Sequence, residues 1–88
     1  MSMLRKYMKL QEDLELKYGK NSVVLYMKGS FYELYSLDID KKQIGDLHTV
    51  SKILNITLTK SNKSLEHSEN NPYMCGFPSY ALRRHPRQ

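Results

Sequence analysis

The sequence predicts an α/β (α+β) fold in which helices flank one small mixed β-sheet. Some segments have the three-to-four-residue spacing of amphipathic helices, whereas others have the apolar or alternating pattern of strands. The chain has 88 residues, which is short beside the roughly 100–150 residues of a common domain. We therefore expect one unit, residues 1–88, with helices packed on its sheet.

Residues 2–18 have the periodicity of an amphipathic helix. Ser2 can cap the first turn of this helix and Gly19 can end it. Its apolar positions are Met3, Tyr7, Leu10 and Leu14. Because these side chains lie along one stripe, we expect all of them to face the core.

Two strand-like runs follow the helix. Residues 23–27 are apolar and partly β-branched, which predicts a buried central strand. Residues 31–37 alternate, and a tight turn at Gly29 would join the two runs as a hairpin. One face of the second run carries Phe31, Glu33, Tyr35 and Leu37.

The stretch after residue 45 predicts a second helix. Asp46 can cap its first turn. The apolar residues that would lie on one side are Leu47, Val50, Ile53 and Leu54. Residues 56–59 then alternate over the length of a short strand.

The last third of the chain is polar before it becomes apolar again. Residues 60–71 are rich in Ser, Asn and charge, so we expect a mobile loop. Residues 73–75 predict one more short strand. Gly76 and Pro78 indicate a turn, after which Ser79 can cap a short final helix.

The composition limits the classes of function. Fourteen Lys and Arg against nine Asp and Glu give a formal net charge of +5, which favours polyanionic partners. The lone Cys75 excludes an internal disulfide, and no Cys/His spacing resembles a zinc site, so no metal is expected. The start of the chain lacks a signal peptide's apolar stretch, and no apolar run could span a membrane. We expect a soluble intracellular protein without a membrane partner, in a compartment that the sequence leaves open.

Phe31 and Glu33 form the most informative pair in the chain. Side chains at i and i+2 of a strand point to the same face. An aromatic ring there can stack on a nucleotide base or separate it from its neighbour, while the carboxylate hydrogen-bonds the edge of that base. The alternatives are a core aromatic residue and a solvated carboxylate.

Nearly the whole chain resembles the N-terminal mismatch-recognition domain, domain I, of the MutS family of DNA mismatch-repair proteins. The resemblance also includes the first helix and the turn at Gly29. It is carried by three blocks in the family's order: Phe31-Tyr32-Glu33-Leu34-Tyr35, Ser51-Lys52-Ile53-Leu54-Asn55-Ile56-Thr57-Leu58-Thr59-Lys60 and Met74-Cys75-Gly76-Phe77-Pro78.

The resemblance implies a binding function for duplex DNA that carries mismatches or small loops. It assigns to Phe31 the minor-groove insertion next to a mispaired or unpaired base, and to Glu33 the hydrogen bond to that displaced base. A mismatch is easier to unstack than a paired step, so discrimination would rest on how readily the duplex deforms. The expected phosphate contacts are Lys28, Lys52 and Lys60.

The sequence also departs from the family's pattern. The stretch 38–46 is longer than in typical bacterial members, and the chain stops at Gln88, soon after the Gly76-Phe77-Pro78 block. It contains no phosphate-binding loop motif, so we expect a truncated domain without ATPase activity, clamp or family-type dimerisation. ATP and magnesium are implied for full-length members only, and neither a cofactor nor a small-molecule substrate is expected for this chain.

Two other functions remain open at this point. One is a remnant or protein-interaction fragment that keeps the fold without useful DNA binding. The other is a nuclease, for which Asp38, Asp40 and Asp46 are a poor candidate site because metal-dependent nucleases need clustered carboxylates.

Overall fold

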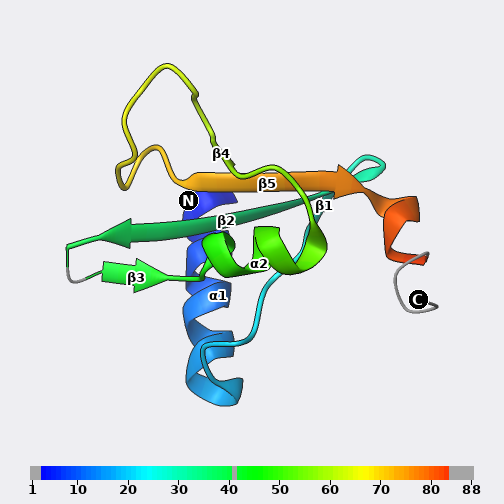
Figure 1. Cartoon of the computed structure of the whole chain (residues 1–88). Helices are drawn as coiled ribbons and strands as arrows, with labels where there is room; N and C mark the ends of the chain where they lie inside the picture. Colours follow the sequence, from blue (N-terminus) through cyan, green and yellow to red (C-terminus); the bar gives the residue numbers. More distant parts are fainter. Residues whose placement is uncertain (1–2, 41, 84–88) are drawn as a thin grey trace.

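The structure, a computed structural model, describes residues 3–40 and 42–83, and side chains through residue 81. It confirms the α/β class: two α-helices pack against one small sheet (Figure 1). All strand pairs in the described residues are antiparallel, so the sheet is not mixed. The elements are α1 (Met3–Tyr18), β1 (Tyr26–Lys28), β2 (Phe31–Ile39), β3 (Lys42–Ile44), α2 (Leu47–Leu54), β4 (Thr59–Lys60), β5 (Tyr73–Pro78) and a final 3₁₀-helix η1 (Ser79–Arg83).

The centre of the sheet is β2, not the apolar run 23–27. The strand order is β1-β2-β5-β4, with β3 paired to the end of β2. Only residues 26 and 27 of the first run become strand, as part of β1, and they lie exposed at an edge of the sheet. Val23 and Leu25 precede the strand and pack against the core as irregular chain. The apolar character of Val23 and Leu25 therefore reflects burial of their side chains, and it does not indicate a central strand.

The predicted hairpin between β1 and β2 is confirmed. Lys28 pairs with Phe31, so residues 29 and 30 form a two-residue turn. Gly29 has φ of 64°, a conformation that glycine adopts without the penalty of a side chain. Positive φ at the first turn residue fits the type II′ hairpin, whose twist matches that of the strands.

Gly76 and Pro78 lie within strand β5 and not in the predicted turn. Gly76 pairs with Glu33, and Pro78 pairs with Phe31. The backbone changes direction only at Ser79, whose N–H donates to the Ser30 carbonyl (2.8 Å). The apolar residues of this block pair with β2 on one side, which extends the strand beyond the predicted 73–75.

Helix α1 is confirmed, but its buried stripe differs from the predicted one. Tyr7 and Gln11 are buried, whereas Leu10 is 57% exposed. The Gln11 amide is satisfied by three hydrogen bonds: it donates to Glu15 Oε2 (2.7 Å) and the Ser22 carbonyl (2.7 Å), and it accepts from Val24 N–H (2.9 Å). The predicted N-cap, Ser2, lies outside the described residues.

Helix α2 begins as predicted at Asp46. The Asp46 carboxylate accepts from the Thr49 hydroxyl (2.7 Å) and the Thr49 N–H (3.2 Å). These bonds hold the pKa of Asp46 below its ordinary value. Leu47 is buried, but Ile53 is 75% exposed and is not part of the predicted apolar face.

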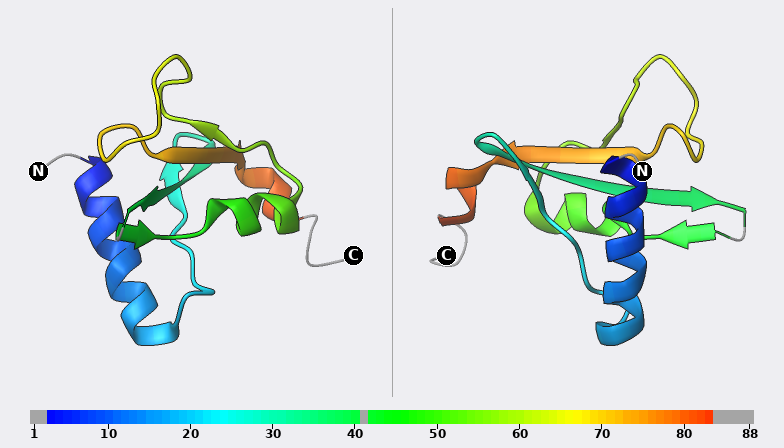
Figure 2. Two further views of the ribbon diagram at one scale, coloured as in Figure 1. Left: turned by 60° about the vertical axis from the view of Figure 1, so that its left-hand side comes forward. Right: turned by 180° about the vertical axis from the view of Figure 1, so that it is seen from behind.

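The two helices cover opposite faces of the sheet. Leu47 of α2 packs with Leu34, Cys75 and Phe77, which form the core cluster. On the other face, the Tyr7 ring of α1 contacts the Tyr35 ring. Figure 1 shows α2 in front of β2 and α1 behind it, and the reversed view in Figure 2 shows α1 in front. No helix in the described part of the chain is long and apolar enough to cross a membrane.

Residues 61–71 of the predicted loop 60–71 form a loop that one buried side chain organises, whereas Lys60 belongs to strand β4. The Asn71 carboxamide accepts from Asn62 N–H (2.7 Å) and donates to three carbonyl oxygens. These acceptors belong to Asn62, Leu65 and Glu66. Asn71 therefore fixes the path of a loop that bears no helix or strand.

Candidate functional site

The Phe31 and Glu33 side chains lie on one face of β2, as predicted, beyond the part that α1 covers. Tyr35 and Leu37 continue this face and are buried at 5% and 3% exposure. Phe31 is 49% exposed and Glu33 is half-buried. One strand thus changes from a solvent-facing surface to core within a few residues, which gives the exposed pair a rigid base.

Glu33 is held by the next residue on its face. The Tyr35 hydroxyl donates to Glu33 Oε1 at 2.7 Å. The Tyr35 ring meets the Tyr7 ring edge-on at 5.2 Å, and the Tyr7 hydroxyl donates to the Val24 carbonyl at 2.6 Å. Burial raises the pKa of Tyr7 to about 12. These contacts connect the site carboxylate to helix α1.

An open depression lies beside Phe31 and Glu33. It has a volume of about 480 Å³ and is lined by Phe31, Glu33, Thr57, Leu58, Thr59, Lys63, Met74 and Gly76. Gly76 is the direct cross-strand neighbour of Glu33 and presents no side chain to it. A Cβ at this position would meet only the Tyr32 carbonyl oxygen, at 3.5 Å. The backbone at position 76 does not require glycine, so the effect of glycine here is to leave open space beside Glu33.

The predicted phosphate contacts separate into different places. Lys28 pairs with Phe31 across the hairpin and shares its face. Lys60 pairs with Tyr73 and belongs to the other face. Lys52 is exposed on α2, the helix that covers that other face. The structure therefore brings Lys28, but not Lys52, to the Phe31 and Glu33 pair.

Lys63 is a cation of the depression that the sequence did not indicate. It lies in the loop 61–71, where no periodic pattern marks which side chain returns to the sheet. No ion pair within the described residues involves Lys28 or Lys63. Both ammonium groups are therefore available to an anionic ligand.

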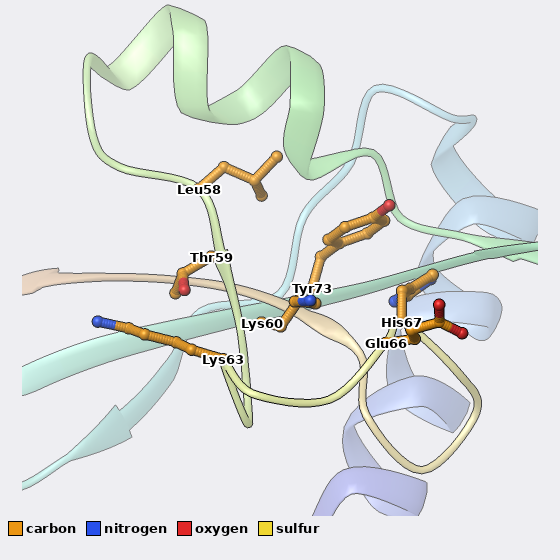
Figure 3. Close-up of a pocket in the computed structure, with 7 residues that line it drawn as sticks. All are labelled: Leu58, Thr59, Lys60, Lys63, Glu66, His67 and Tyr73. Atoms are coloured by element: carbon orange, nitrogen blue, oxygen red, sulfur yellow. The ribbon is translucent and has the colours of Figure 1, made fainter.

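A second hollow of about 520 Å³ adjoins the first and shares Leu58, Thr59 and Lys63 with it. Tyr73 lines it and stacks on His67 at 3.8 Å, and His48 contacts the Tyr73 ring edge-on at 4.8 Å. Figure 3 shows the Lys63 side chain extending away from the Tyr73 and His67 pair. His67 and His48 already contact the Tyr73 ring, so this ring is not free to stack on a nucleotide base. The depression beside Phe31 and Glu33 is therefore the better candidate site for such a base.

The full length of the chain, residues 1–88, matches the family model for MutS domain I. The chain belongs to the MutS domain I family. The protein named DNA mismatch repair protein MutS from Borreliella burgdorferi (strain ZS7) is 36% identical over 86 residues, or 98% of this chain. Proteins of the same name from Acholeplasma laidlawii and Petrotoga mobilis are 33% and 36% identical over 92% and 91% of it.

The MutS domain I match concerns a small part of each relative. This chain spans 8% of the Borreliella and Acholeplasma proteins and 7% of the Petrotoga protein. No solved structure matches the chain significantly. In the described part of this MutS domain I, no group of three or more His, Cys, Asp or Glu residues is placed to hold a metal ion.

Proposed function

We propose that this chain binds mismatched or unpaired bases in duplex DNA. Phe31 enters the minor groove and stacks on the displaced base, and Glu33 hydrogen-bonds the edge of that base. The observation that carries this proposal is the exposed Phe31 ring beside Glu33, on one face and next to an open depression. Insertion of an apolar wedge costs a few kcal/mol of stacking, and a mismatch has already lost part of that stacking.

Lysines around the depression supply the sequence-independent part of the binding. Lys28 and Lys63 flank the aromatic ring and the carboxylate, where they offset the repulsion between Glu33 and phosphates. Lys60, in β4 on the other face of the sheet, lines the adjoining second hollow and supplies a further cation there. Each phosphate that a lysine neutralises contributes about −0.9 to the slope of log affinity against log salt.

A comparison of two duplexes tests the proposed function. The chain is titrated by fluorescence anisotropy at low salt with a matched duplex and with the same duplex carrying one G·T mismatch or one unpaired thymine. We expect tighter binding of the defective duplex, by about tenfold, and no change on addition of ATP or magnesium. Equal affinity for both duplexes would indicate a fold kept without mismatch recognition, and cleavage with magnesium would indicate a nuclease.

The space above Gly76 gives a sharper prediction. Gly76→Val is expected to fill the depression and remove the preference for the defective duplex. The fold should persist, because a Cβ meets only one atom at 3.5 Å and valine favours strand conformation. Anisotropy measures the preference, and thermal unfolding measures the stability, which we expect to change by less than about 1 kcal/mol.

Gly76→Ala is the matched control for this substitution. Its single methyl group occupies little of the depression, so most of the preference should remain. A folded Gly76→Val variant with full preference would place the base elsewhere on the protein.

A further inference from the structure

Lys63 is held at the rim of the depression by a tightly bonded turn. It lines the depression beside Phe31 and Glu33, and it forms no ion pair with any residue that the structure describes. A lysine on an irregular loop ordinarily loses much conformational freedom when it binds an anion. The hydrogen bonds around Lys63 reduce this loss, because they fix the backbone of the turn before any ligand arrives.

Asn71 holds this turn from within the loop. Its side chain is 4% exposed, and its Oδ1 accepts from the Asn62 N–H (2.7 Å). The amide nitrogen donates to the carbonyl oxygens of Asn62 (3.0 Å), Leu65 (3.1 Å) and Glu66 (2.9 Å). Lys63 therefore lies between two backbone positions, Asn62 and Leu65, that are both bonded to one buried side chain.

A second set of hydrogen bonds closes the turn on its outer side. Asn62 Oδ1 accepts from the Ser64 N–H (3.1 Å) and from the Ser64 hydroxyl (2.7 Å). A bond from an Asn side chain to the backbone two residues later forms a local turn of defined shape. The residues on both sides of Lys63 are thus fixed, whereas the Lys63 side chain itself is exposed.

The place of Lys63 selects one part of a bound duplex. A base that stacks on Phe31 stays covalently linked to its own two phosphates, so these lie near the rim of the depression. Lys63 is the cation of that rim. Lys28 belongs to β1, on the opposite side of β2 from β5, β4 and the loop that bears Lys63. The two lysines therefore face different phosphates.

We propose that Asn71 is a positioning residue that presents Lys63 to a phosphate flanking the displaced nucleotide. This inference rests on the proposed function above. It assigns one lysine to one phosphate, whereas a flexible cation contacts whichever phosphates pass near it. Because the turn is ordered before binding, the contribution of Lys63 to affinity depends on the Asn71 hydrogen bonds.

A double-mutant cycle tests the role of Asn71. The wild-type chain, Lys63→Ala, Asn71→Ala and the double variant are titrated by anisotropy with a duplex that carries one unpaired thymine. Each single substitution should weaken binding by about three- to fivefold, the scale of an exposed ion pair, and should reduce the salt slope by up to about one unit. The double variant should bind as Lys63→Ala does, within about twofold, because Asn71 acts through Lys63.

A neutral phosphate locates the contact. Each of the two phosphates that flank the unpaired thymine is replaced in turn by an uncharged methylphosphonate. One replacement should weaken binding of the wild-type chain by about three- to fivefold and leave Lys63→Ala and Asn71→Ala almost unaffected. In the matched control variant Lys28→Ala the same replacement should keep its full effect, because Lys28 lies on the other side of Phe31.

Two further variants separate positioning from stability. Asn70→Ala changes an exposed asparagine of the same loop and should leave both the affinity and the salt slope unchanged. Asn62→Ala removes the outer bonds of the turn at an exposed position, so it should act in the same direction as Asn71→Ala. It keeps the inference testable if Asn71→Ala does not fold, which circular dichroism establishes.

The outcomes distinguish this inference from the proposed function. If Asn71→Ala weakens binding as much in the Lys63→Ala background as in the wild type, Asn71 acts through the fold and the inference is overturned. A methylphosphonate that affects Lys63→Ala as strongly as the wild type overturns it too, and in both cases the preference for the defective duplex stands. If the wild-type chain binds matched and defective duplexes alike, the proposed function fails, and the inference fails with it because it needs a displaced nucleotide.

Discussion

Replacing Phe31 with alanine is expected to abolish the preference for a duplex that carries a mismatched or unpaired base. Stacking of a base on an aromatic side chain contributes about 1–3 kcal/mol, so the defective duplex should lose about ten- to a hundredfold in affinity. The fold should remain, because Phe31 is 49% exposed and lies outside the core cluster. Anisotropy titrations of matched and defective duplexes measure the loss, and circular dichroism confirms the fold.

Lys63→Ala is the matched control for Phe31→Ala. It removes a charge from the same depression, so it should weaken binding of both duplexes by the same factor. It should also reduce the salt slope by about one unit. If Phe31→Ala behaved in this way instead, with both affinities reduced and the preference kept, Phe31 would be a general contact and not a wedge.

The second large effect that we expect is a loss of stability in the variant Gln11→Leu. The Gln11 side chain is fully buried and satisfies Glu15, the Ser22 carbonyl and the Val24 N–H. Leucine has a similar size but leaves the Ser22 carbonyl and the Val24 N–H without this partner, at about 1–3 kcal/mol for each one that water does not reach. Glu15 keeps the Gly45 N–H and Lys20 as partners. The free energy of unfolding should fall by about 3 kcal/mol or more, a large part of the total for a small domain. Urea and thermal unfolding measure it, with a drop in Tm of more than about 10 °C.

Leu10→Ala provides the matched control on the same helix. Leu10 is 57% exposed, so truncating its large apolar side chain should lower the free energy of unfolding by less than about 1 kcal/mol. The opposite ranking of the two variants would mean that α1 presents Leu10, and not Gln11, to the sheet.

The contrast between Leu10 and Gln11 also shows where sequence reasoning reached its limit. Apolar spacing identified α1 and nearly its ends, but it assigned the buried side by hydrophobicity. A glutamine can be fully buried when its amide meets donors and acceptors of a neighbouring segment, here residues 22–24. Those partners are 11 and 13 residues away in the chain, so no local pattern predicts them.

The site was more predictable than the packing around it. Strict alternation along β2 placed Phe31 and Glu33 on one face, and the pairing of Tyr26 with Glu33 confirms the predicted hairpin. Gly76 was predicted as a turn residue because glycine and proline commonly mark turns, yet it lies in β5 opposite Glu33. The approach of Lys63 depends on how the Asn71 side chain shapes its loop, which only the folded chain shows.

The division of β2 into an exposed start and a buried continuation has a consequence for how such a protein would drift in evolution. Selection for a folded chain acts most strongly on Leu34 and its buried neighbours, and it acts less on Phe31 and Glu33, which lie outside the core cluster. A lineage released from the need to bind DNA would lose these two side chains first and keep its abundance and melting behaviour. Screens for expression would pass such a protein unchanged. Retention of both residues in a diverged homologue would therefore be a sign of selection on binding itself.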